Sequence, residues 1–337
     1  MAEHSVRHQG HERAPTVYNM SDDRDLNWTT LPPSQLLETV DLISFYLYHK
    51  ARLEREVMAR DTQPKQPKVC LDVAIDHRIR RLFRPVLVDL QEHSNHVSRL
   101  EVRGRMLKRS RHEIQVTAQL AGPAAKGGIA IALQQPRNNH PFEKGLDAVI
   151  EDCGTLYALY DIFTAVSCGT LDIRTDITIV DLLPYEHEKV AEIGDDAKLR
   201  ESFSTSTQII CDKEPGVLLC AGKIWLPSAG KFDDRKGEAW KFESAGLGKK
   251  FGSTAKLPVA TKIRSEEGGF VTIPRVNGFH PSFAMNYHPH VGLLRQLQIL
   301  IGAETCGMLR GDWEDEEWMD ELRRRCQEIS CTLSGKG

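Results

Sequence analysis

Three short apolar runs constrain the fold of this chain more than any other feature of its sequence. They comprise residues Gly127–Leu133, Ile177–Leu183 and Val217–Gly222. Short runs that are apolar at nearly every position are typical of strands buried on both faces, as in parallel sheets covered by helices. The intervals 146–166 and 198–211 are long enough for crossover helices, so the sequence predicts right-handed βαβ units.

A fourth strand is expected at Phe270–Val276, and a helix is expected at 293–308. The predicted fold class is therefore α/β, with three α/β/α layers around a central, mostly parallel four-stranded sheet. This core would comprise residues 121–226 and 270–310. A Gly- and Lys-rich insertion at 227–269 separates its two parts, and a segment of that length is usually functional or disordered.

The segments on either side of this core have patterns of their own. Residues 1–31 are charged and contain few apolar side chains, which predicts a disordered tail. Residues 32–120 predict a helical N-terminal extension that includes a basic segment. Residues 311–337 predict a C-terminal helix, because acidic side chains at its start and basic ones at its end complement the helix dipole.

The basic segment lies near the end of the predicted extension. The whole chain has 44 basic and 47 acidic residues, so it is not a bulk polycation that coats nucleic acid, although a local basic groove remains compatible. The segment is either a solvated helix face or a patch that contacts phosphates. The residues of this possible nucleic-acid patch are Arg105, Lys108, Arg109 and Arg111.

Cysteine and histidine spacing gives no support for a metal or a cofactor. None of the eight cysteines form a CxxC pair, the usual sequence trace of clustered thiolate ligands. His288 and His290 flank Pro289, which prevents a helical pair of ligands beside His280. The chain also has no dinucleotide-binding glycine motif, P-loop or nucleophile elbow. We therefore expect neither metal nor cofactor.

The N-terminal sequence bears on the compartment. Residues 1–30 lack the apolar segment of a signal peptide, and no stretch approaches the ~20 apolar residues that span a bilayer. We therefore expect no membrane partner, reduced thiols, and a location in the nucleus or the cytoplasm.

Polar residues follow each predicted parallel strand. Ligands of parallel α/β sheets bind beyond the carboxyl ends of the strands, because the connecting loops open a crevice there. In this chain the strand ends carry Gln134–Gln135–Pro136, Asp181–Tyr185, Ala221–Lys223 and Gly278–Ser282. The sequence therefore predicts the functional site at these four segments.

The order of these segments resembles a known family. Ile129–Pro136, Ile177–Pro184, Pro215–Gly222 and Val276–Ser282 are similar to the motifs of the uracil-DNA glycosylase superfamily, in the same order. His280–Pro281–Ser282 is the best match, to the His–Pro–Ser loop that comes last in that superfamily. The resemblance implies a protein that flips a nucleotide out of the stack and reads the Watson–Crick edge of its base. Its partner would be DNA or a nucleobase-like ligand.

The resemblance also implies a role for each strand-end residue. His280 would donate to the oxygen of the leaving base, and Gln135 would lie at the glycosidic bond with Gln134. Ser282 would hold a phosphate, with Pro281 stiffening its loop. The remaining roles are base recognition by Asp181, Gln134, Phe142 and Tyr185, and a phosphate contact by Arg137.

Three departures from the family pattern weaken the prediction of catalysis. Gln135 stands where the family has a water-positioning Asp or Asn, and an amide cannot accept the proton of that water. Gln134 replaces a glycine, which crowds close approach of the backbone. Asp181 stands where an Asn often reads uracil, and an ionised carboxylate only accepts hydrogen bonds, so it suits an amino-bearing base such as cytosine or adenine. Asp181 could equally cap the following turn.

Three functions remain open at this point. The first is an active DNA N-glycosylase, and the second is a non-catalytic relative that binds a nucleobase or nucleic acid. The third is an unrelated α/β protein that binds or modifies a small molecule of specialised metabolism. We place binding ahead of catalysis, because Gln135 keeps the loop and lacks the acid.

Overall fold

The computed structural model describes residues 90–137, 139–167, 169–187, 196–222, 259–284 and 291–307, together with isolated positions at 242, 244 and between 320 and 331. The chain divides into two units, 1–78 and 79–337, and every described residue belongs to the second. The predicted tail at 1–31 lies outside the described residues. So do residues 32–89 of the predicted extension, most of the 227–269 insertion and most of the helix predicted at 311–337.

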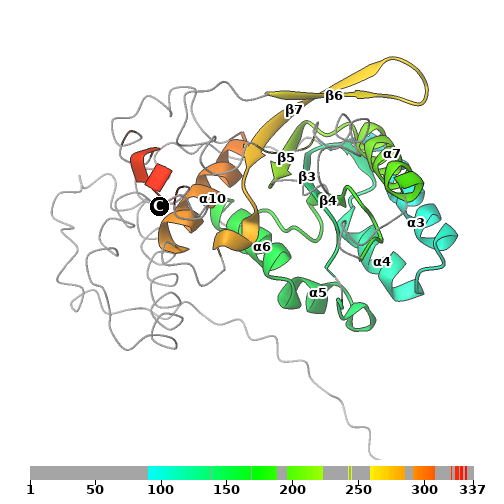
Figure 1. Cartoon of the computed structure of the whole chain (residues 1–337), viewed down its shortest axis with the longest axis horizontal. Helices are drawn as coiled ribbons and strands as arrows, with labels where there is room; N and C mark the ends of the chain where they lie inside the picture. The colour runs from blue at the N-terminus through cyan, green and yellow to red at the C-terminus, as the bar shows by residue number, and fades with distance from the viewer. Residues whose placement is uncertain are drawn as a thin grey trace, which may run out of the picture. The chain divides into compact units, whose positions relative to one another are not determined.

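A five-stranded sheet lies at the centre of the described unit (Figure 1). In spatial order its strands are β4 (Ile177–Asp181), β3 (Ile129–Leu133), β5 (Val217–Ala221), β7 (Phe270–Gly278) and β6 (Ala260–Arg264). The first four run parallel, and β6 pairs antiparallel with β7. The predicted mixed α/β fold with a mostly parallel sheet is confirmed, and the sheet has five strands where the sequence predicts four.

Strand β6 lies inside the segment that the sequence predicts as an insertion. Thr261 and Ile263 are buried, whereas Lys262 between them is exposed and lies over the ring of Phe270, with its Nζ 4.7 Å from the ring centroid. A short alternating strand at the edge of a sheet gives a weaker sequence signal than an apolar run, because half of its side chains face water.

One face of the parallel strands packs on α3 (His96–Met106), α4 (Arg111–Leu120) and α7 (Asp196–Lys213). Alternate strand residues point to this face, as the two-residue period of a strand requires. Those in the shared apolar core are Ala130, Ala132, Val180, Leu182, Leu218 and Cys220. Leu100 of α3 and Phe203 of α7 belong to the same core, so part of the segment predicted as an N-terminal extension packs directly on the sheet.

The other face is covered by α6 (Gly154–Val166) and α10 (Val291–Thr305). A Cβ added at Gly278 would lie 3.1 Å from Leu219 Cδ1 and 3.3 Å from Ile301 Cγ2, so α10 sits directly on β5 and β7. The two helices also pair through Arg295, whose Nε and one terminal nitrogen each lie 3.1 Å from Asp161 Oδ2. The predicted crossover at 146–166 is two helices, α5 (Leu146–Asp152) and α6, with Cys153 between them.

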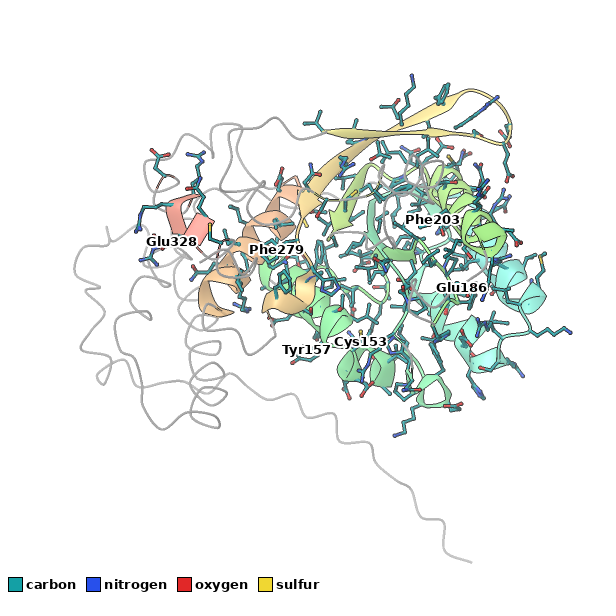
Figure 2. All side chains as sticks on the ribbon, viewed as in Figure 1. Cys153, Tyr157, Glu186, Phe203, Phe279 and Glu328 are labelled. Atoms are coloured by element: carbon teal, nitrogen blue, oxygen red, sulfur yellow. The ribbon has the colours of Figure 1, made fainter. Side chains whose placement is uncertain are left out.

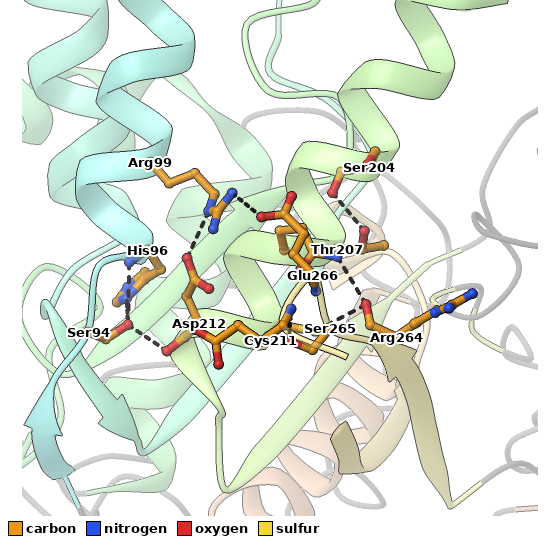
Figure 3. A network of polar contacts seen from close by, with 12 residues as sticks. Ser94, His96, Arg99, Ser204, Thr207, Cys211, Asp212, Arg264, Ser265 and Glu266 are labelled. Carbon is orange, nitrogen blue, oxygen red and sulfur yellow. Dashed lines mark hydrogen bonds and ion pairs between the residues drawn. The ribbon is translucent and has the colours of Figure 1, made fainter. Parts of the chain in front are cut away.

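The β6–β7 hairpin is tied to the helices at its turn (Figure 3). Arg99 of α3 donates from Nε to Asp212 Oδ2 at 2.8 Å and from a terminal nitrogen to Glu266 Oε2 at 3.0 Å. Gln208 of α7 donates to Arg264 O and accepts from Glu266 N, both at 3.0 Å. These contacts join a hairpin to helices that are far from it in sequence. A smaller antiparallel pair, β1 (Leu90–His93) with β2 (Ala125–Gly127), precedes the main sheet.

Candidate functional site

The order of the parallel strands defines where a ligand would bind. The chain passes from β3 to β4 on one side and returns to β5 on the other side of β3. The loops that leave β3 and β5 therefore diverge, and in parallel α/β sheets the crevice between such loops is where ligands bind. Gln134 directly follows β3, and Gly222 directly follows β5.

The strand register brings the predicted strand-end residues to one edge. Leu133 is level with Asp181, Ala132 with Cys220, and Ala221 with Gly278. Gln135 and His280 each lie two residues beyond this level on strands separated by β5. Because neighbouring strands are about 4.8 Å apart, their backbones are separated by roughly 10 Å. The structure therefore places Gln135, Asp181 and His280 at the same edge of the sheet.

Asp181 is the last residue of β4, and its carboxyl group is half-buried. Within the described part of the chain it makes no hydrogen bond or ion pair through its side chain. It does not cap the following turn, because Leu182 N and Leu183 N donate to Leu133 O and Gln134 O, each at 2.9 Å. Burial raises the pKa of Asp181 to about 7, against a smaller lowering effect of His187.

Gln134 and Gln135 connect the loops after β3 and β4. Gln134 Nε2 donates to Gln135 Oε1 at 3.0 Å, and Gln135 Nε2 lies 3.5 Å from Glu186 O. The carboxylate of Glu186 is itself buried and accepts from Lys198 Nζ at 2.6 Å. Gln135 therefore links Gln134, after β3, to the backbone of Glu186, after β4.

Cys153 is a site residue that the sequence analysis does not single out. Figure 2 labels it at the start of α6. Burial raises the pKa of its thiol, the N–H groups of Leu156 and Thr155 act in the opposite direction, and the nearby Asp181 carboxyl raises the pKa further. Cys153 is therefore a protonated thiol beside the Asp181 carboxyl. A lone cysteine inside an apolar helical pattern gives no sequence signal for such a place.

Phe142 lies between two histidine rings. Its centroid is 5.5 Å from that of His140 and 6.1 Å from that of His187, both in edge-to-face contact. His187 Nε2 is 2.7 Å from Glu113 Oε1, and burial lowers the pKa of His140 to about 4. Arg137 pairs with Asp152 Oδ2 at 3.1 Å and is more than half exposed. The ring of Phe142 thus contacts His140 and His187, and the guanidinium of Arg137 is paired with a carboxylate.

His280 is held in a defined orientation beyond β7. Its Nδ1 is 2.8 Å from Ser282 Oγ, and burial lowers its pKa, so the ring is neutral near pH 7. The hydroxyl that the resemblance assigns to a phosphate thus contacts the imidazole instead. Pro281 is buried and opens a short 3₁₀ helix, Pro281–Ala284. Gly222 has a φ of 134°, and a Cβ there would lie 3.4 Å from His280 Cβ.

Tyr185 does not lie where a base could stack on it. The side chain is 1% exposed, and its hydroxyl donates to Leu100 O at 3.1 Å. A Cβ added at Gly104 would lie 2.8 Å from Tyr185 Cζ, so the ring is pressed against α3. The prediction that Tyr185 contacts a base is therefore corrected, because the ring fills the core between β4 and α3.

The basic residues of the predicted patch lie at the turn between α3 and α4, which we call the basic turn. Glu113, in the first turn of α4, reaches His187 just beyond β4, and Gly104 near the end of α3 contacts Tyr185. Both contacts place the basic turn at the carboxyl edge of the sheet. Its members are Arg105, Lys108, Arg109 and Arg111, of which Arg105, Lys108 and Arg111 are exposed.

Across the ranges described between residues 90 and 331, no group of three or more His, Cys, Asp or Glu side chains is arranged to hold a metal ion. His288 and His290 lie outside the described residues. In the same ranges, no helix has the length and apolar character that crossing a membrane requires.

Comparison with known proteins adds no relative to this description. No protein-family model, curated protein or solved structure matches the chain.

Proposed function

We propose that this protein binds a nucleobase at the carboxyl edge of β3, β4, β5 and β7, carried by a nucleoside or by a single-stranded nucleic acid. The observation that carries the proposal is the half-buried carboxyl of Asp181, which has no hydrogen-bond partner in the described part of the chain. Buried polar groups are normally paired, because leaving one unpaired costs free energy. A ligand with hydrogen-bond donors would supply the missing partners.

The basic turn supports a ligand that carries phosphates. Arg105, Lys108 and Arg111 are exposed at the same edge as Asp181. Arg105 pairs with Glu101 at 3.5 Å, in an exposed contact that is readily exchanged. Exposed Lys and Arg side chains bind a phosphate backbone through charge, without regard to its sequence. A strand held at the basic turn would present a base to the strand ends.

Hydrolysis of the glycosidic bond is the weaker part of the proposal. A neutral His280 oriented by Ser282 can donate a hydrogen bond to a leaving base when Nδ1 accepts from the hydroxyl, since Nε2 then carries the proton. The water would still need a base, and Gln135 cannot accept its proton. Binding therefore comes before catalysis in this proposal, and any hydrolysis would be slow or directed to an altered substrate.

The test is a binding titration with nucleosides and with fluorescent single-stranded oligonucleotides over a range of salt concentrations. Replacing Arg105 and Lys108 by Ala should weaken oligonucleotide binding and flatten its salt dependence by about 1–2 in log–log slope, while leaving nucleoside affinity unchanged. The matched control replaces Arg264 and Lys262, an exposed pair of the same residue types on β6. The control should bind like the parent.

Two outcomes would redirect the assignment. Absence of binding to every nucleoside and oligonucleotide would refute the proposal and leave the alternative, a small-molecule protein of specialised metabolism. Release of abasic product from DNA that contains uracil or hypoxanthine, lost in His280→Ala, would instead show that hydrolysis persists. Unlabelled DNA without modified bases is the negative control.

A further inference from the structure

Asp181 differs from the other buried or half-buried carboxylates that the structure describes. Glu186 is paired with Lys198, Glu113 with His187 and Asp161 with Arg295. Asp181 lies level with Leu133 of β3 and interacts electrostatically with Cys153 and His187, and none of the described residues donates to its carboxyl. The carboxyl is thus open to donors from a ligand, since no described residue supplies one.

The two titratable side chains that interact electrostatically with the Asp181 carboxyl, His187 and Cys153, do not hydrogen-bond to it. The imidazole of His187 is engaged by Glu113 at 2.7 Å. The thiol of Cys153, which interacts with the Asp181 carboxyl, is protonated and neutral. The ligand must therefore bring N–H groups aimed at both oxygens if the ionised carboxylate is to be satisfied.

The arrangement of donors distinguishes the bases. Above its pKa of about 7, the ionised carboxylate of Asp181 offers two adjacent acceptors and no donor. On the Watson–Crick edge of cytosine or adenine the amino group stands next to a ring nitrogen that is an acceptor, and this lone pair would face the second carboxylate oxygen. Uracil has one donor between two acceptors. Guanine alone has two neighbouring donors, N1–H and the 2-amino group.

We propose that Asp181 selects guanine, its two carboxylate oxygens accepting hydrogen bonds from N1–H and from the 2-amino group of the base. This inference rests on the proposed function and refines it, because it chooses among the amino-bearing bases. The guanine is carried by a free guanosine nucleotide or by an unpaired position of a single strand. Both sources present the same edge, and the experiment separates them.

The experiment measures affinity of the full chain for guanosine and for inosine, which lacks only the 2-amino group, at pH 8, where the Asp181 carboxyl is ionised. Loss of one hydrogen bond to a charged acceptor corresponds to roughly 10- to 100-fold in affinity, so guanosine should bind more tightly than inosine by that factor. Adenosine, cytidine and uridine should bind more weakly than guanosine. Guanosine monophosphate and a single-stranded oligonucleotide with one guanine among thymines distinguish the two sources of the base.

Asp181→Asn tests the assignment to this residue. An amide offers one donor and one acceptor, so the variant should reduce the guanosine-to-inosine ratio to less than about 3-fold. The matched control is Asp147→Asn, which changes a mostly exposed carboxylate that pairs with Arg174, outside the site. The control should keep the full ratio. Circular dichroism of both variants confirms that each is folded.

The results separate two failures. Equal affinity for guanosine and inosine, with other nucleosides bound equally well, would overturn the selection of guanine and leave the proposed function standing. Binding of no nucleoside or oligonucleotide would overturn both. Tighter binding of arginine amide than of guanosine would also overturn the inference, because it would show that the carboxylate takes a cationic guanidinium instead of a base.

Discussion

Replacing Asp181 by Asn should change how the stability of the protein depends on pH. Burial raises the pKa of this carboxyl to about 7 in the folded chain, whereas an unfolded Asp has a pKa of roughly 3.9. Between these values the folded state keeps a proton that the unfolded state has released. The free energy of unfolding therefore falls as pH rises from about 4 to about 7, and the parent loses stability across this window.

The magnitude follows from the two pKa values. A difference of about three in pKa corresponds to about 4 kcal/mol between pH 4 and pH 8, since each pKa unit is worth about 1.4 kcal/mol. Between pH 5 and pH 8 the same group accounts for about 2–3 kcal/mol. Asp181→Asn cannot ionise, so this part of the pH dependence should be absent from the variant.

Urea unfolding followed by circular dichroism at pH 5, 6, 7 and 8 measures the effect. The quantity of interest is the difference in unfolding free energy between variant and parent, which should grow in favour of Asn as pH rises. His187 and Cys153, which interact with the Asp181 carboxyl, remain in both proteins, so the difference isolates this carboxyl. Asp147→Asn provides the control, with a curve parallel to the parent. Parallel curves for Asp181→Asn as well would refute the claim that the carboxyl is desolvated and unpaired.

Three further substitutions test other parts of the structure. Gly222→Ala should destabilise the fold by roughly 1–3 kcal/mol, because a φ of 134° strains any residue with a side chain; urea unfolding measures this loss, and unchanged stability would contradict the strain. Phe203→Ala should cost about 3–5 kcal/mol in the same unfolding assay, because this ring is 2% exposed in the core. A cost below about 1 kcal/mol would contradict that packing. Arg99→Ala should cost only roughly 0.5–1 kcal/mol, because its ion pairs are partly exposed, yet it should speed amide exchange in the hairpin turn at Glu266. Unchanged exchange there would mean that the pairs do not hold the hairpin.

The sequence predicts the parallel sheet because a central strand that is buried on both faces consists of a continuous run of apolar residues. Gln135, Asp181 and His280 could be assigned to one edge for the same reason, since the carboxyl ends of parallel strands face the same way. Strand β6 could not be recognised with the same ease, because its outward residues include Lys262 and its pattern is interrupted by water-facing positions.

The roles of individual side chains depend on partners that are distant in sequence. The burial of Tyr185 follows from Leu100 and Gly104, and no local pattern around residue 185 announces them. The contact between Glu113 and His187 likewise joins helix α4 to the loop after β4, which are far apart in the sequence. Asp181 is the reverse case, because its proposed role rests on the lack of a hydrogen-bond partner among the described residues, and a sequence does not record an unfilled hydrogen bond.

The close packing of Gly104 against Tyr185 affects how far the basic turn lies from the strand ends. A Cβ at position 104 would lie 2.7 Å from Ile114 Cγ1 and 2.8 Å from Tyr185 Cζ, so a larger residue requires one of these side chains or the end of α3 to shift. If α3 shifted, the charged residues of the basic turn would move away from the strand ends, although none of them had been replaced. Gly104→Ala would thus change the distance that a bound nucleic acid must span between phosphates held at the basic turn and a base held at the ends of the β-strands.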